Sequence, residues 1–212
     1  MPCAICETRR PKRFCPGIGG DICTICCGTE REVTVTCPLD CEFLLEARRH
    51  DKPLPLEANQ LPNRDIRVPE KFLEEHEELL AFLGQAFARA ALATPGAVDL
   101  DVRDALDALI RTYRTLESGV YYDTVPAGPV AANVYRMVQG WIAEYRRAEQ
   151  QRLGISHTRD ADVLWLLVFL QRLELTQNNG RRRSRAFIGA IRAFYGDGSV
   201  AESSAPSSLI LP

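Results

Sequence analysis

The chain has 212 residues, 46% of them hydrophobic and 25% charged, which is the composition of an ordinary globular protein with room for one sizeable core and a small extra module. A formal net charge of −2 excludes a protein that attracts nucleic acid over its whole surface, so any such binding must come from a local basic patch. The longest wholly apolar run covers residues 163–170, far short of the ~20 residues of a membrane-spanning helix, so we expect no membrane segment.

The N-terminal 41 residues carry the strongest chemical signal, because they contain every cysteine of the chain. The eight cysteines are Cys3, Cys6, Cys15, Cys23, Cys26, Cys27, Cys37 and Cys41. Zinc prefers four tetrahedral ligands, and a short Cys-x2–4-Cys pair supplies two of them from one turn. Eight thiolates therefore predict two zinc sites, with two Zn²⁺ per chain and no cysteine left over.

Disulfides, an iron–sulfur cluster and a redox relay are the alternatives to zinc. The first residues are not a basic segment followed by an apolar run, so we expect no secretory leader and a cytoplasmic protein. Clustered cysteines in that setting more often bind metal than form disulfides. No strand–helix pattern of the thioredoxin type surrounds Cys3 or Cys23, so zinc is the preferred interpretation.

The spacing also predicts how the ligands divide. Adjacent side chains point apart, so Cys26 and Cys27 are expected to serve different metals. One of the two completes a site with Cys3, Cys6 and Cys23, and the other joins a second set. That second set is Cys15, Cys37 and Cys41. Ligands of one site then lie between ligands of the other, which is a cross-brace.

The order Cys3-x2-Cys6, Phe14-Cys15-Pro16, Cys23-x3-Cys27 and Cys37-x3-Cys41 resembles the double-zinc fingers of the HIT and MYND type. The resemblance implies one zinc on Cys3, Cys6, Cys23 and Cys27, and the other on Cys15, Cys37 and Cys41. Ile18 stands where those fingers have a ligand, and Cys26 is extra and would substitute for it. Because such fingers mostly bind other proteins within larger assemblies, the resemblance implies an interaction module.

The basic cluster Arg9–Arg13 has two interpretations. Four thiolates around each Zn²⁺ leave the metal-loaded module with a net negative charge, which these side chains would offset. Alternatively, they contact the phosphates of a nucleic acid.

After Cys41 the sequence predicts helices. Residues 42–50 read as a short exit helix, which gives a cysteine-rich module over residues 1–50. Prolines indicate a linker over residues 51–68. Apolar residues then recur at helical spacing in a bundle over residues 69–195, and residues 196–212 read as a flexible tail. The five expected helices of the bundle span residues 69–93, 100–117, 129–153, 160–176 and 183–195. The predicted fold class is therefore mostly α, a small two-zinc module followed by an all-α bundle of about five helices.

The bundle contains a cluster of arginines at residues 181–185 that suggests a negatively charged partner. Arg181, Arg182, Arg183 and Arg185 lie at the start of the last helix, where the helix dipole opposes positive charge. A phosphate backbone, the acidic stretch Glu74–Glu78 or the negatively charged zinc module would each offset them, and the remaining alternative is that water alone solvates them. These arginines are therefore candidates for binding an anion or a nucleic acid.

The function that this pattern favours is a zinc-binding interaction or adaptor protein, with a protein partner whose contact surface spans both parts. The alternative is a nucleic-acid-binding protein that uses Arg9–Arg13 and Arg181–Arg185. We expect no enzyme and no small-molecule substrate, because no catalytic constellation is recognisable and four cysteine ligands leave zinc no open position.

Overall fold

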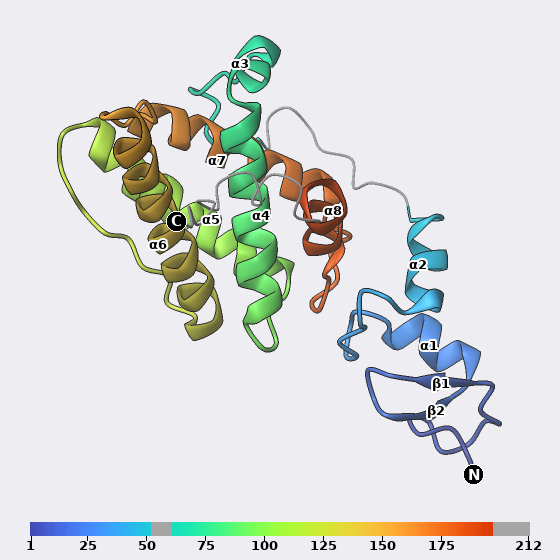
Figure 1. Cartoon of the computed structure of the whole chain (residues 1–212). Coiled ribbons are helices and arrows are strands. Elements are labelled where there is room, and N and C mark those ends of the chain that lie inside the picture. Colours follow the sequence, from blue (N-terminus) through green and yellow to red (C-terminus); the bar gives the residue numbers. More distant parts are fainter. Residues whose placement is uncertain (52–60, 197–212) are drawn as a thin grey trace, which may run out of the picture.

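The computed structural model describes residues 1–51 and 61–196, and this part of the chain is mostly helical. Figure 1 shows a helical bundle at one end and a small cysteine-rich unit at the other. The predicted class, mostly α with a cysteine-rich N-terminal segment, is confirmed. The elements are β1 (Arg13–Cys15), β2 (Gly20–Ile22), α1 (Thr24–Glu30), α2 (Glu42–Arg48), α3 (Glu70–Glu75), α4 (Glu77–Ala93), α5 (Asp99–Glu117), α6 (Pro129–Leu153), α7 (Asp160–Gln177) and α8 (Ala186–Tyr195).

Residues 1–48, here called the cysteine module, contain a two-stranded antiparallel sheet. β1 pairs with β2 in the register Arg13 with Ile22 and Cys15 with Gly20. Apart from the cysteines, its buried cluster contains only Ile22, Val35 and Leu44. Burial of so few apolar side chains cannot by itself stabilise a module of this size. The folding of the module therefore depends on its cysteines.

The bundle core is built from α4 to α8, with α7 buried on more than one side. Val163, Leu166 and Leu170 of α7 are fully buried between α5 and the helices α4 and α8. α4 in turn packs on α6 and α8, and α5 on α6. The all-round apolar sequence of α7, which predicted a central helix, is explained by this position.

The predicted helix over residues 69–93 is divided into α3 and α4. His76 leaves helical geometry, with φ −118° and ψ 25°. Its imidazole stacks on the Phe72 ring at a centroid distance of 4.1 Å, and its Nδ1 lies 2.9 Å from the Phe72 carbonyl oxygen. His76 therefore holds the corner between the two helices.

Two predicted segments lie largely outside the described residues. Of the predicted linker, residues 52–60 are not described, and residues 61–68 lie on the bundle, where Ile66 is buried. Of the predicted tail, only Gly196 is described. Among the described helices, none combines the length and the apolar character needed to cross a membrane.

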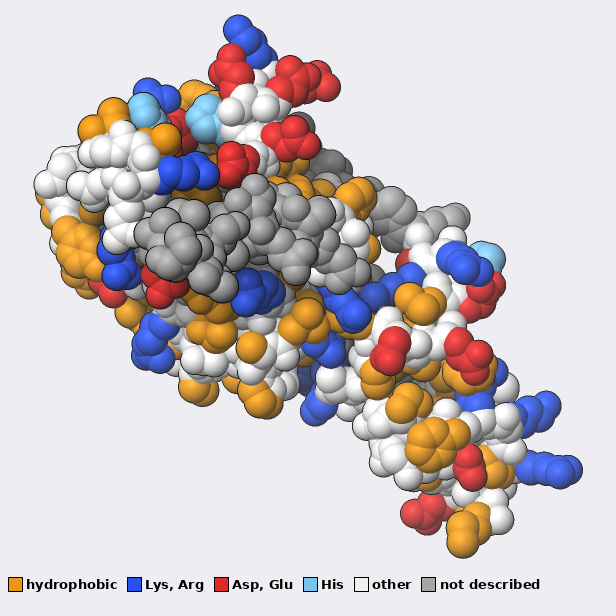
Figure 2. All heavy atoms as spheres, in the orientation of Figure 1, with side chains coloured by type: hydrophobic (Ala, Val, Ile, Leu, Met, Phe, Trp, Pro, Cys, Tyr) orange, Lys and Arg blue, Asp and Glu red, His pale blue; other side chains and the backbone are white. Residues whose placement is uncertain are grey.

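The surface between the two ends is rich in positive side chains. In Figure 2, lysine and arginine side chains gather over the stretch where the bundle meets the cysteine module. The helix of the bundle at this boundary is α8 (Figure 1). The segment that precedes α8 contacts the cysteine module, since the Arg183 N–H donates to the Glu32 carbonyl oxygen at 2.8 Å.

α4 and α8 approach so closely at Gly84 that no larger residue fits there. A Cβ atom added at Gly84 would lie 2.2 Å from the Tyr195 ring, whereas one added at the exposed Gly140 of α6 would meet nothing within 4 Å. We expect Gly84→Ala to lower the free energy of unfolding by about 1–3 kcal/mol through overpacking. The matched Gly140→Ala should raise it by about 0.5–1 kcal/mol. Urea denaturation of both variants checks this, and equal effects of the two would contradict the close contact.

Candidate metal centre

Four cysteines from two separate turns converge in the cysteine module. Their Sγ atoms all lie within 4.8 Å of one another, and the group, here called the first tetrad, is Cys3, Cys6, Cys23 and Cys26. Zn–S bonds of about 2.3 Å in a tetrahedron place sulfurs about 3.8 Å apart, so the tetrad needs only a small contraction to hold one ion. Four soft thiolates are the donor set that zinc favours. The first tetrad is therefore a possible metal site.

Local backbone structure positions these ligands. Cys23 is the N-cap of α1, and its Sγ accepts a hydrogen bond from the Cys26 N–H at 3.4 Å. The Cys23 N–H in turn donates to Cys3 Sγ at 3.2 Å. The turn after Cys3 closes through the Glu7 N–H, which donates to the Cys3 carbonyl at 2.8 Å, and Glu7 adopts a φ of 53°. Backbone N–H groups aimed at sulfur stabilise thiolates and fix their direction.

The thiols of the first tetrad differ in acidity. The Thr8 hydroxyl, followed by the backbone N–H groups of Thr8 and Arg9, lowers the pKa of Cys6 to about 5. Burial, followed by hydrogen bonds to the neighbouring cysteines, raises the pKa of Cys26 to about 12. Four thiols this close cannot all ionise without a cation between them, and a bound metal ion removes that conflict.

Cys27 does not belong to the first tetrad. The implication of the HIT/MYND resemblance that Cys27 joins Cys3, Cys6 and Cys23 is therefore wrong, because Cys26 takes that place. Both residues lie in α1, where consecutive side chains diverge by about 100°, so only one of them can point at the tetrad.

The remaining cysteines lie around a different space. Cys15, Cys27, Cys37 and Cys41, here called the second quartet, all border one small cavity of about 20 Å³ between β1, α1 and α2. The rest of its wall is mostly apolar and also contains two arginines: Arg13, Phe14, Pro16, Ile22, Arg31, Pro38, Phe43 and Leu44. Burial raises the pKa of Cys37, and the charges of Glu32, Cys41 and Cys15 raise it further against a backbone hydrogen bond.

Arginines of the Arg9–Arg13 cluster lie next to cysteine sulfurs. Arg13 Nη1 and Arg31 Nη2 each lie 3.7 Å from Cys27 Sγ. Arg13 also covers the Phe43 ring at 3.9 Å from its centroid. A hydrogen bond to Cys23, supported by the charge of Cys6, raises the pKa of Arg9. Arg9 and Arg13 thus lie where they offset thiolate charge, while Arg10 and Lys12 are exposed.

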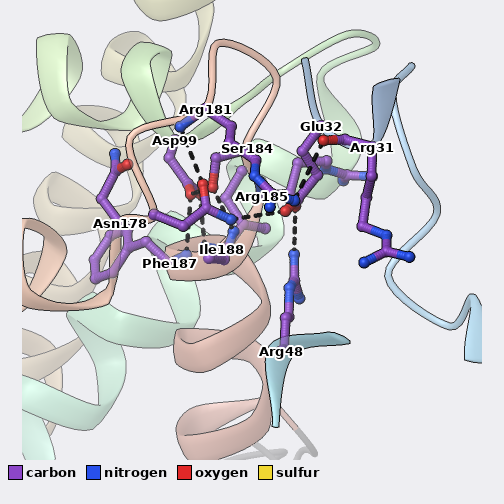
Figure 3. A network of polar contacts seen from close by, with 12 residues as sticks. Arg31, Glu32, Arg48, Asp99, Asn178, Arg181, Ser184, Arg185, Phe187 and Ile188 are labelled. Carbon is purple, nitrogen blue, oxygen red and sulfur yellow. Dashed lines mark hydrogen bonds and ion pairs between the residues drawn. The ribbon is translucent and has the colours of Figure 1, made fainter. Parts of the chain in front are cut away.

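The loop of residues 178–185, here called the arginine loop, lies against the cysteine module. Its anchor is Glu32, whose side chain is 1% exposed and whose backbone has a φ of 56° (Figure 3). The Glu32 carboxylate accepts hydrogen bonds from Arg48 Nη2 at 2.7 Å, from Asn179 Nδ2 at 2.8 Å and from the Arg185 N–H at 3.2 Å. Its carbonyl oxygen accepts from the Arg183 N–H at 2.8 Å. The loop is thus held to the module by a buried residue, whose carboxylate accepts from the Asn179 side chain and the Arg185 N–H.

A second buried carboxylate caps α8. Asp99 accepts hydrogen bonds from the N–H groups of Phe187 at 3.1 Å and Ile188 at 3.0 Å, and from the Ser184 hydroxyl at 2.7 Å. Burial raises the pKa of Asp99, and these hydrogen bonds oppose the rise. Asp99 is the first residue of α5, where an acid usually serves its own helix. Since it serves α8, only the packing of the two helix ends reveals its role.

Glu32 was not recognisable from the sequence. It lies between Cys27 and Cys37, directly before the short alternating stretch Val33–Thr36, and an acid at such a position usually faces solvent. In the structure, the positive φ and the burial of Glu32 together identify it as the residue that anchors the loop. Of the other candidates for pairing with the arginine loop, Glu74–Glu78 lies on α3 and α4, and it makes no salt bridge to this loop in the described residues.

Comparison with protein-family models, with curated proteins and with solved structures finds no match to this chain. The chemistry of the cysteine module and its contacts must therefore carry any functional argument.

Cys26 and Cys27 provide a matched pair for testing the first tetrad. We expect Cys26→Ser to abolish tight metal binding by the first tetrad, because serine is a poor zinc ligand. Cys27→Ser should leave that tetrad intact. Cobalt titration followed by absorbance of the thiolate bands, combined with native mass spectrometry, checks this. Intact metal binding at the tetrad in Cys26→Ser with loss in Cys27→Ser would restore the assignment that the resemblance implied.

Glu32 provides a second test. Glu32→Ala removes a buried carboxylate and leaves Arg48 without its charge partner, which typically costs about 3–5 kcal/mol. We expect the amides of Arg183 and Arg185 to lose hydrogen-exchange protection, while amides in the centres of α5 and α7 keep theirs. Glu30→Ala is the control, since the Glu30 carboxylate contacts only the exposed Thr34 hydroxyl. Unchanged protection in Glu32→Ala would show that the carboxylate does not hold the loop.

Proposed function

We propose that this chain is a zinc-binding interaction protein whose zinc ions are structural. The observation that carries the proposal is the convergence of Cys3, Cys6, Cys23 and Cys26, because a four-thiolate tetrad, here with three of its cysteines buried, is the donor set of structural zinc. A module with so small an apolar cluster gains its folding free energy from the ion, which makes the bound metal a condition for any surface that the module presents.

A second zinc ion belongs to the proposal. Cys15, Cys27, Cys37 and Cys41 border a cavity of about 20 Å³, which is the space of a single small ion or water molecule. Zinc would contract this quartet around itself, and the guanidinium groups of Arg13 and Arg31 would offset its negative charge. The ligands of the two sites alternate along the chain, so both ions together would brace the module.

Both proposed sites would be closed. Four thiolates complete a tetrahedral zinc ion and leave no position for water or substrate, which is the arrangement of structural and not of catalytic zinc. Zinc would therefore supply rigidity, and a non-enzymatic role follows. Reduced thiols are a requirement of this arrangement, which fits a cytoplasmic protein.

A protein partner is the best-supported ligand. The resemblance of the cysteine spacing to HIT and MYND fingers points to protein binding, and apolar side chains such as Phe14 (59% exposed) and Ile25 (53% exposed) stand on the outside of the module. Because Glu32 ties the module to the arginine loop, a partner would meet both parts as one surface.

Nucleic-acid binding is the alternative function. It draws on Arg9–Arg13 and on the arginine loop, but several of these arginines already contact sulfurs or acceptors of the cysteine module. Binding through phosphates would weaken steeply as salt is added.

The proposal predicts two zinc ions per freshly purified chain, measured by native mass spectrometry with elemental analysis. Removal of zinc by a chelator, or the variant Cys23→Ser, should unfold the module and leave most of the helical circular-dichroism signal. In quantitative affinity mass spectrometry, a defined partner should be retained by the zinc-loaded chain and lost with Cys23→Ser. Zinc-free protein with a folded module, or retention that ignores Cys23→Ser, would refute the proposal.

A further inference from the structure

The boundary between the bundle and the cysteine module exposes more positive charge than it neutralises. Six arginines, here called the arginine seam, come from the end of α1, from the arginine loop and from α8: Arg31, which also lies beside Cys27 Sγ, and Arg181, Arg182, Arg183, Arg185 and Arg192. Within residues 1–51 and 61–196, no carboxylate forms a salt bridge with any of them. Arg182, Arg183 and Arg192 are exposed, and Figure 2 shows positive side chains gathered over this boundary.

The two acids nearest to the seam cannot neutralise it from outside. Glu32 and Asp99 are 0% and 1% exposed, and their oxygens are occupied by Arg48, Asn179 and the N-terminal amides around α8. Burial lowers the pKa of Arg185, Asp99 partly opposes this, and the charges of Arg48 and Arg192 lower it further. The seam therefore has a surplus of positive charge that an outside anion would relieve.

The seam exists only when the two parts are docked. Arg181 Nη1 lies 3.4 Å from the Arg31 carbonyl oxygen, and Arg183 Nη1 donates to the Thr36 hydroxyl at 2.9 Å. Arg48 lies over Gly189 of α8, where an added Cβ would come within 2.8 Å of its Nη1. Side chains of the bundle thus reach the loop of the module, and those of the module reach α8.

All the cations of the seam are arginines, whose planar forks pair with carboxylates in two parallel hydrogen bonds. A long phosphate backbone fits less well, because it offers no apolar side chains to the exposed Val33 and Phe194. Val33 follows Glu32 in the module, Phe194 lies in α8, and both are exposed. They could contact apolar side chains that lie between the acidic residues of a peptide. We propose that the arginine seam binds an acidic segment of a protein partner.

This inference rests on the proposed interaction function and names the chemistry of the partner. Its test is fluorescence anisotropy of the zinc-loaded full chain with a labelled peptide of alternating glutamate and serine. The same peptide with glutamine in place of glutamate and a labelled oligothymidine are the other two probes. We expect the glutamate peptide to bind, the glutamine peptide not to bind, and oligothymidine to bind more weakly. Affinity should fall as salt rises towards ~0.15 M.

Two sets of variants locate the binding. The triple variant Arg182→Ala, Arg183→Ala and Arg192→Ala should weaken the glutamate peptide by about tenfold or more. The matched control removes three exposed arginines from α6 and leaves the seam untouched: Arg136→Ala, Arg147→Ala and Arg152→Ala. The control should bind as the unchanged chain does.

The variant Glu32→Gln distinguishes two models of peptide binding. In one, the peptide needs the docked surface of module and bundle; in the other, charge attraction alone is enough. The variant removes a negative charge, so attraction by charge alone would tighten peptide binding. It also sets an amide against Asn179 or Arg48, which both donate to Glu32, and so disturbs the docking. We expect weaker binding, together with lost exchange protection at Arg183 and Arg185. If Glu32→Gln leaves that protection intact, Glu32→Ala replaces it in the same comparison.

Three results would overturn the inference: tighter binding of oligothymidine than of the glutamate peptide, no peptide binding at low salt, or equal losses in the seam and control variants. The proposed function is tested separately, by retention of a protein partner. If a partner is still retained by the zinc-loaded chain and by the seam variant, the interaction function stands and the seam is not its site. If no partner depends on the zinc-loaded module, both fail.

Discussion

The arrangement of this protein depends on one buried carboxylate. Glu32 projects from the cysteine module to the N-terminal end of α8, where it meets a guanidinium, an amide and a backbone N–H at once. A buried charge is tolerated only when its oxygens are fully paired, so these contacts must form together or not at all. The docking of the module is consequently expected to behave as a two-state contact and not as a loose association.

The same carboxylate links the metal chemistry to the bundle. Glu32 lies between Cys27 and Cys37, and its φ of 56° is a strained backbone conformation for a residue with a side chain. Such strain persists only when the flanking chain is held from both sides. A zinc ion on the second quartet would hold both of these flanking cysteines. Metal binding would therefore support the segment around Glu32 without touching the bundle.

Charge explains why arginines are placed as they are. Arg13 and Arg31 lie beside Cys27, and the guanidinium of Arg48 lies against Glu32. Positive side chains in this region thus lie beside the cysteine sulfurs, pair with the buried acid or face solvent. Those that face solvent are the ones left for a partner.

The sequence by itself determined the helical class, the approximate helices of the bundle and a cysteine cluster that could bind metal, because apolar periodicity and short Cys-x2–4-Cys spacing are local properties. Even the conflict between the positive residues Arg181–Arg185 and their helix dipole was visible there. Only the tertiary structure decided that Cys26 and not Cys27 joins the first tetrad, since spacing allows both and the rotation of α1 chooses. It alone revealed Glu32 and Asp99 as the buried acids that hold the arginine loop and the first turn of α8, because contacts across about 90 to 150 positions leave no trace in local sequence pattern.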